Sequence, residues 1–326
     1  MKPEPATTDP GERAPWHFWL IPLLVAALRA IPFLVTRLAS PPPGSVFPAV
    51  GYNPIDWFAY AAFVRQAAET GDWLLANPYA TAAQDGRYIL PLFSFLGHLR
   101  RWTGADPFWL LELVRWPLVF LFFAVLWRFL GPLLPNARQR LLAAWLVGGS
   151  GGVESLLLLT LEAWPAKLQT VALQALSEDH GWSTFAALSN PLWVAGLTCS
   201  LIALRPLVMP SSVPRWRDAA QLGVGLVVTY CVHPYSGLVV LGVALLLPAA
   251  RWVLGLPGRG LAQGVASGAA LAAALALIAG VALWQNQDPV YRMTAQRVLG
   301  QTQLSVFWYP VTLGMVGLLA LRGWRH

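Results

Sequence analysis

Charged residues are scarce in this chain. They make up 11% of its 326 residues, against about 25% in an average soluble domain. Hydrophobic residues make up 56%, so the composition excludes an ordinary soluble globular protein and predicts that lipid is the main solvent. Cysteine is also scarce: Cys199 and Cys231 both lie in apolar runs. Their positions predict neither a metal site nor a disulfide and do not indicate a redox compartment.

Tryptophan, in contrast, is abundant. The chain has 17 tryptophans, and indole rings favour the boundary between membrane and water. The formal net charge is +7, but the basic residues are dispersed over many short loops and form no single stripe. This dispersion argues against a nucleic-acid partner. Loop arginines that set the orientation of a membrane protein explain the charge instead.

Long apolar runs predict an all-α, polytopic membrane helix bundle. A helix needs roughly 20 residues to cross a bilayer, and all the runs except 219–232 approach that length. The first run exceeds the roughly 7–15 residue core of a signal peptide, which favours a transmembrane helix. Residues 1–15 are polar and proline-rich and are expected to form a disordered tail, which leaves 16–326 as the transmembrane domain. About eight spans are expected, at residues 16–38, 107–134, 141–161, 184–207, 219–232, 235–254, 261–284 and 304–321.

The basic residues set the orientation of these spans. A break at His233-Pro234 separates 219–232 from 235–254, and proline supports it because proline stops a helix. Merging the two spans would place Arg251 and Arg259 outside, against the positive-inside rule. With the break and a cytoplasmic N-terminus, the inner segments hold Lys2, Arg13, Arg128, Arg138, Arg140, Arg205, Arg215, Arg217, Arg251, Arg259, Arg322 and Arg325, and the short outer segments hold Arg37, Lys167, Arg292 and Arg297. The sequence therefore predicts a cell-membrane protein whose acid–base chemistry lies on the outer face.

Residues 39–106 form a long outer segment in which two interfacial helices are expected. One covers about 54–70, because Asn53 can cap it and the following proline suits its first position. The other covers about 89–102, and it is apolar but short, so it is expected to lie on the membrane. Asp56 falls in the first turn of the first helix. There it either satisfies the helix N-terminus or remains ionised as a base or metal ligand.

Short motifs follow Asp56. Tyr60 comes four residues later in a D-x-x-x-Y pattern, followed by the turn Gly71-Asp72-Trp73 and the stretch Asn77-Pro78-Tyr79. Together, over about residues 16–134, they resemble the polyprenyl-phosphate-dependent glycosyltransferases of the GT-C type. The resemblance implies a GT-C-like fold, a lipid-phosphate-linked sugar donor, Asp56 as catalytic base and Tyr60 at the substrate. Members of that family usually have more spans, so it also implies a short member or a piece of a longer protein.

The other outer segments carry further candidates, each with a structural alternative. Glu178, Asp179 and His180 in SEDHGW have side chains that bind divalent ions such as Mg²⁺ or Mn²⁺, and Glu178 and Asp179 are the expected ligands. They could equally line a sugar pocket or belong to a solvated loop. His233 and Tyr235, at the predicted break, either contact the substrate or form a turn.

Three arginines are candidates for binding the lipid phosphate. Arg292 and Arg297 follow the last outer turn, and Arg65 belongs to the first interfacial helix. Guanidinium groups hold phosphate by paired, charge-assisted hydrogen bonds. The same side chains could instead extend toward lipid headgroups without any catalytic role.

Four charges fall within predicted spans. A charge in the bilayer costs at least about 2.5 kcal/mol on insertion scales, so each is expected to have a partner. Glu112 and Arg115 are three residues apart on one helix and are expected to pair. Arg29 and Glu154 are expected to pair between helices.

The expected function is inverting transfer of a sugar from a polyprenyl phosphate to a lipid, glycan or protein acceptor. Nucleotide sugars stay in the cytoplasm, so a transferase at the outer face needs a lipid-carried donor. A membrane transporter or lipid flippase is the alternative, and it predicts functional charges near the bilayer midplane on broken helices. Arg29, Glu154 and the His233-Pro234 break are the features it would use. A non-catalytic membrane scaffold is the third interpretation.

Overall fold

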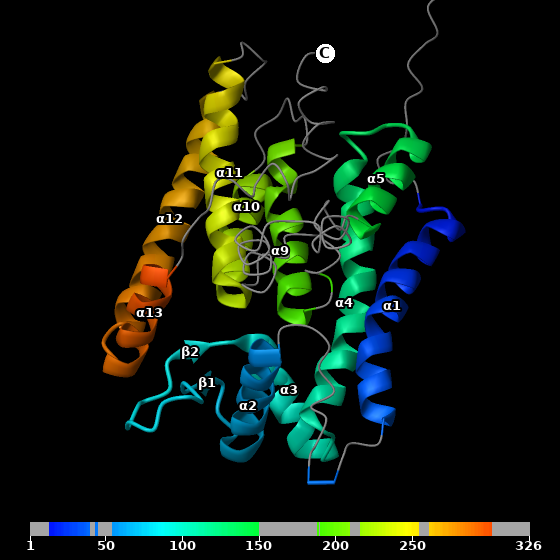
Figure 1. The fold of residues 1–326 in the computed structure, drawn as a ribbon. Helices are drawn as coiled ribbons and strands as arrows, with labels where there is room; N and C mark the ends of the chain where they lie inside the picture. Colours follow the sequence, from blue (N-terminus) through cyan, green and yellow to red (C-terminus); the bar gives the residue numbers. More distant parts are fainter. Residues whose placement is uncertain are drawn as a thin grey trace, which may run out of the picture.

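The computed structural model describes residues 13–39, 43–44, 54–149, 188, 190–208, 216–253 and 261–301 (Figure 1). These residues are mostly helical, as predicted. Four of the described helices are long and apolar enough to cross a membrane, at Trp16–Val35, Pro107–Leu130, Pro191–Val208 and Gly264–Gln285. The predicted span 304–321 and most of the predicted span 141–161 lie outside the described residues. The count of eight spans and the GT-C-like arrangement therefore stay predictions.

The first part of the bundle joins η1 (Trp16–Trp19), α1 (Leu20–Leu38), α4 (Pro107–Leu130) and α5 (Ala137–Gly149). Asp106 caps α4, because its Oδ1 accepts hydrogen bonds from the backbone N–H groups of Phe108 and Trp109 at 2.9 and 3.3 Å. Gly148 of α5 brings that helix against α1 and α4: a Cβ there would lie 3.0 Å from Ile21 and from Phe123. Small residues of this kind allow close helix contacts where lipid provides no hydrophobic drive between helices.

The second part joins α9 (Pro191–Val208), α10 (Trp216–Val232), α11 (Pro234–Val253) and α12 (Leu261–Gln285). Glycines of α10 make its close contacts with two neighbours. A Cβ at Gly225 would lie 2.7 Å from the Cβ of Ala203 in α9, and one at Gly223 would lie 2.9 Å from the backbone oxygen of Ala270 in α12. The helix α10 therefore packs between α9 and α12, in agreement with Figure 1.

The predicted break at His233-Pro234 is confirmed as a boundary between two helices. The helix α10 ends at Val232 and α11 begins at Pro234. A Cβ at Gly237 would lie 2.8 Å from the Cα of Tyr230, so the chain turns back on itself and the two helices form a hairpin. The first helix of this hairpin begins at Trp216, three residues earlier than the sequence indicated.

The long segment after α1 folds into what we call the platform: α2 (Pro54–Thr70), β1 (Leu74–Leu75), β2 (Tyr88–Ile89) and α3 (Pro91–Thr103). The first helix has its predicted bounds, whereas the second begins at Pro91 instead of about residue 89, because Tyr88–Ile89 belong to an antiparallel β1–β2 pair that was not predicted. Gly97 of α3 lies so close to α2 that an added Cβ would clash with the Cβ of Ala67 and lie 2.8 Å from the backbone oxygen of Val64.

The platform covers one end of the bundle (Figure 1). Exposed aromatic side chains are found there and at the opposite end. Trp102 of the platform is 81% exposed, whereas Trp16 and Trp216, which begin η1 and α10 at the opposite end, are 77% and 74% exposed. Two levels of exposed indole rings separated by apolar helices are typical of a protein that crosses a membrane.

A charged pair is buried inside α4, as the sequence predicted. Glu112 and Arg115 form an ion pair whose side chains are 6% and 1% exposed. Arg115 Nε donates to Glu112 Oε2 at 2.9 Å, and its Nη2 donates to the backbone oxygen of Ala26 in α1 at 3.0 Å. Trp116 Nε1 donates to Glu112 Oε1 at 3.1 Å. The partner proposed for Arg29, Glu154, lies outside the described residues.

Candidate functional site

The candidate base Asp56 lies in the first turn of α2, at the platform. The hydroxyl of Tyr60, one turn further along, donates a hydrogen bond to Asp56 Oδ2 at 3.2 Å. The D-x-x-x-Y spacing therefore places two side chains on one helix face in direct contact. A carboxylate at this position is also favoured by the positive end of the helix dipole. Both contacts favour the charged form of the Asp56 carboxylate. A charged carboxylate agrees with either role predicted for Asp56, as a group that satisfies the helix N-terminus or as an ionised base or metal ligand.

Asn190, which was not predicted from the sequence, extends this contact to α9. Its Nδ2 donates to the hydroxyl of Tyr60 at 3.0 Å. Its Oδ1 accepts from the backbone N–H groups of Leu192 and Trp193 at 3.0 and 3.4 Å, so Asn190 caps α9. The signal was present as an asparagine directly before a proline, but that dipeptide fell inside a predicted span.

Two further tyrosines lie within the electrostatic range of Asp56. The pKa of the Tyr79 hydroxyl is raised by burial and, secondarily, by the charge of Asp56. The hydroxyl of Tyr235, at the start of α11, also interacts electrostatically with Asp56. Over the whole residue, Tyr79 and Tyr235 are 65% and 56% exposed, so the burial affects only part of each side chain. The structure thus brings the predicted residues Asp56, Tyr60 and Tyr235 to one end of the bundle, together with a tyrosine from the Asn-Pro-Tyr motif.

His233 lies beside this group, in the break between α10 and α11. Its Nδ1 is 2.7 Å from the Oγ of Ser236, and its ring centroid is 5.8 Å from that of Trp193 in α9. Its exposed fraction is only 9%, and burial lowers the pKa of His233 to about 4. The imidazole is therefore neutral at physiological pH and packs mainly against α9, where Gly196 leaves room for it.

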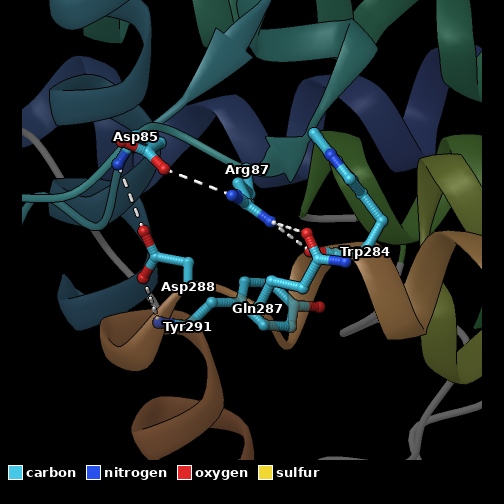
Figure 2. Close-up of polar contacts among 6 residues, drawn as sticks. All are labelled: Asp85, Arg87, Trp284, Gln287, Asp288 and Tyr291. Atoms are coloured by element: carbon cyan, nitrogen blue, oxygen red, sulfur yellow. Dashed lines mark hydrogen bonds and ion pairs between the residues drawn. The ribbon is translucent and has the colours of Figure 1, made fainter.

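The segment that joins β1 to β2 lies against the junction of α12 and α13 (Pro289–Gln301). Figure 2 shows its central contacts. Arg87 donates to the backbone oxygen of Trp284 and, at 3.1 Å, to Gln287 Oε1. Its guanidinium is also paired with Asp85 at 3.2 Å. These contacts join the β1–β2 segment to the α12–α13 junction in one network, although the two segments are almost 200 positions apart in the sequence.

Asp288 is the second link in this network. Its Oδ1 accepts from the backbone N–H of Tyr291, which makes it the cap of α13, and its Oδ2 accepts from the backbone N–H of Asp85 at 3.1 Å. The N–H of Tyr291, the N–H of Asp85 and the charge of Arg87 keep the pKa of Asp288 below its ordinary value. Asp288 thus fixes the β1–β2 segment to the start of α13.

The Asn-Pro-Tyr motif forms a bridge between this junction and Asp56. Asn77 Nδ2 donates to the hydroxyl of Thr294 in α13 at 3.0 Å. Its Oδ1 accepts from the backbone N–H of Tyr79 at 2.9 Å, which closes an Asx-turn. One side chain therefore ties α13 to the loop and directs the tyrosine that lies near Asp56.

The Gly71-Asp72-Trp73 motif ends α2. Gly71 has φ +81°, and its N–H donates to the backbone oxygen of Ala67 at 3.0 Å. A left-handed residue after the last turn is a common helix end and favours glycine. The backbone oxygen of Trp73 then accepts from Ser94 of α3 at 2.9 Å. This motif has a structural explanation without any ligand.

The candidate arginines are placed differently from one another. Arg65 forms an exposed ion pair with Glu69 at 3.6 Å. It lies nine positions after Asp56 on the same helix, roughly 13 Å along the axis at about 1.5 Å per residue. The side chain of Arg292 in α13 is exposed. Arg297 belongs to the same helix, but its side chain lies outside the described residues.

The predicted metal ligands Glu178 and Asp179, with His180, lie outside the described residues. Within the described ranges, no group of three or more His, Cys, Asp and Glu side chains is placed to hold a metal ion. Asp56 is the one acid among the contacts described above around Tyr60. These residues do not by themselves form a ligand set for Mg²⁺ or Mn²⁺, which prefer several oxygen ligands.

No family model, curated protein or solved structure matches this chain.

Proposed function

We propose that this chain is a membrane glycosyltransferase that transfers a sugar from a polyprenyl-phosphate donor to an acceptor hydroxyl or amide. The observation that carries the proposal is the hydrogen-bonded Asp56–Tyr60 pair at the start of α2, with Tyr79 and Tyr235 nearby. It places a carboxylate at the end of a helical bundle whose apolar helices suit a membrane. A lipid-carried donor and an acceptor from water or from the membrane can meet at such a position.

The proposed reaction is an inverting displacement. Asp56 accepts the proton of the acceptor as the acceptor attacks the anomeric carbon, and the bond from that carbon to the phosphate oxygen breaks. The leaving polyprenyl phosphate carries negative charge and needs cationic partners. The exposed Arg292 of α13 is suited to this role, because Asn77 links α13 to the loop that carries Tyr79, and Arg297 of the same helix is the second candidate. Arg65 is less suited to it, because its backbone lies roughly 13 Å from that of Asp56 along α2 and its side chain is paired with Glu69.

The proposed location is the cell membrane, with the N-terminus in the cytoplasm and Asp56 on the outer face. Support comes from the ends of the helices. The platform end carries Asp56, Asp106 and Asp288, whereas at the opposite end Arg128 lies in the last turn of α4 and Arg138 in the first turn of α5, on either side of a short connection. Arginine-rich short loops remain in the cytoplasm.

The position of the helix break favours the transferase over a transporter. Broken helices in transporters bind their cargo near the bilayer midplane. Here the break at His233 lies beside Trp193, in the first turn of α9, and therefore at the end of the bundle. The buried charges Glu112 and Arg115 pair with each other on a single helix, so they form no relay between helices.

The test is sugar transfer by the purified protein in lipid vesicles. A radiolabelled polyprenyl-phosphate hexose is supplied with a cell-envelope extract as acceptor, and label lost from the donor is measured. We expect transfer by the wild type and at least a hundredfold loss in Asp56→Asn. Asp72→Asn is the matched control, because its exposed acid follows the end of the same helix and is expected to leave transfer unchanged. Undiminished transfer in Asp56→Asn would end the assignment.

A further inference from the structure

The hydrogen-bond chain from Asn190 to Asp56 has a fixed direction. Asn190 Oδ1 is occupied by the backbone N–H groups that begin α9, so its amide must present Nδ2 to Tyr60. The oxygen of Tyr60 accepts that N–H at 3.0 Å. The hydroxyl proton of Tyr60 then points to Asp56 Oδ2 at 3.2 Å. Asp56 can accept this proton only with a free lone pair, which the ionised carboxylate always offers.

The two intermediate side chains are held firmly. Tyr60 is 7% exposed and Asn190 is 5% exposed. The ring of Tyr60 stacks on Phe93 of α3 with centroids 4.6 Å apart, and Asn190 is fixed by its cap. Neither side chain presents a large surface to a ligand. Their burial indicates that they act on the half-buried Asp56 rather than on a substrate.

We propose that Asn190 and Tyr60 are positioning residues that keep the carboxylate of Asp56 ionised and hold its orientation. This inference rests on the proposed function for its catalytic meaning. It assigns Tyr60 a role in orienting the base, where the resemblance implied contact with the substrate. It also couples the start of α9 to the site: when α9 shifts, the donor to Tyr60 shifts with it. A charge-assisted hydrogen bond is the strong type, so its loss should affect the charged form of Asp56 most.

Two substitutions separate this role from mere support of the fold. Tyr60→Phe keeps the ring that stacks on Phe93 but removes the hydroxyl. Asn190→Asp keeps a good helix cap but replaces the N–H donor by a second carboxylate oxygen, which competes for the proton of Tyr60 and repels Asp56. Tyr88→Phe is the control, because it also removes a tyrosine hydroxyl from the platform, but that hydroxyl interacts with Thr294 and Asn77 rather than with Asp56.

The first readout is the pH profile of sugar transfer. In Tyr60→Phe and Asn190→Asp we expect kcat to fall about ten- to a hundredfold, the usual effect of losing one hydrogen bond to a charged group. We expect KM to change less than about twofold. The acid limb of the profile should move about one pH unit upward, because the ionised form has lost a donor. Damage to the fold alone would lower the amount of active protein without moving the limb.

The second readout needs no transfer activity. Protein labelled with ¹³C at the aspartate carboxyl groups is reconstituted in lipid, and the Asp56 resonance is identified by its loss in Asp56→Asn. The midpoint of its titration should rise by about one pH unit in both variants and stay in place in Tyr88→Phe. Unmoved midpoints in both variants would overturn the inference, even if Asp56→Asn abolishes transfer. A wild type without transfer but with shifted midpoints in the variants would refute the proposed function and leave the positioning role standing.

Discussion

The ion pair in α4 should stabilise the bundle only while both partners are present. Glu112→Gln removes the negative charge with almost no change of shape and leaves the guanidinium of Arg115 at 1% exposure. Removing one partner of a buried pair costs about 3–5 kcal/mol, because the remaining charge is uncompensated. The new amide oxygen can still accept from Trp116, which donates to Glu112 at 3.1 Å. The expected loss is therefore electrostatic rather than steric.

The double variant Glu112→Gln/Arg115→Met should recover most of this loss. It removes both charges, and methionine fills a volume similar to that of the arginine stem. Replacing a buried ion pair by apolar groups is often neutral or stabilising. The backbone oxygen of Ala26 loses the donor Nη2, which we expect to cost about 1 kcal/mol. The double variant should then lie within about 1–2 kcal/mol of the wild type.

The free energy of unfolding is measured in mixed micelles by increasing the fraction of a denaturing detergent, with tryptophan fluorescence as the signal. Glu69→Gln is the control, because it breaks an ion pair whose side chains are 63% and 68% exposed. Exposed pairs contribute about 0–1 kcal/mol, so this variant should resemble the wild type. A loss below about 1 kcal/mol in Glu112→Gln, or a double variant no more stable than the single one, would refute the reasoning.

Three further predictions follow from single contacts. Gly97→Leu should separate α3 from α2 and destabilise the protein by about 1–3 kcal/mol in the same assay, whereas Gly149→Leu, which has no atom within 4 Å of an added Cβ, should not. Arg87→Ala should release the segment between β1 and β2 from Trp284, so its amide hydrogens should exchange faster while those of α2 stay protected. His233 has a folded pKa of about 4 against about 6.5 when unfolded, so the neutral form is favoured by folding. The contribution of His233 to the free energy of unfolding is therefore fully present above pH 6.5 and falls by about 3 kcal/mol as the pH is lowered toward 4. His233→Gln should abolish this pH dependence of the free energy of unfolding between pH 6.5 and pH 4.

The features that the sequence predicted well have local causes. The start of α2 was predicted from an asparagine and a proline, and the helix does begin at Pro54. The Glu112–Arg115 pair follows from a spacing of three residues on one helix. The break at His233 followed from a proline and from the charges of later loops. Each of these signals lies within a few consecutive residues or in the number of basic residues in each loop. They could therefore be read without knowing how the helices pack.

The features that the sequence missed depend on contacts between distant segments. Asn190 and Tyr60 are 130 positions apart, and Asp85 and Asp288 are 203 apart. No local pattern indicates which of many polar residues meet across such distances. The β1–β2 pair is only two residues long on each strand, too short for an alternating pattern to appear.

The Gly71-Asp72-Trp73 and Asn77-Pro78-Tyr79 motifs, which suggested a family, make mainly structural contacts in the described residues. Fewer of their side chains therefore remain as candidates for catalysis or substrate binding. Gly71 ends α2, and Asn77 ties the loop to Thr294 while it orients Tyr79. Neither of these needs a ligand to explain its contacts. Of the motif residues, the half-buried Asp56 and the exposed Tyr79 remain for chemistry, and they interact with each other. A substrate for the proposed reaction should therefore contact both, and Tyr79→Phe should weaken donor or acceptor binding without the pH shift expected for Tyr60→Phe.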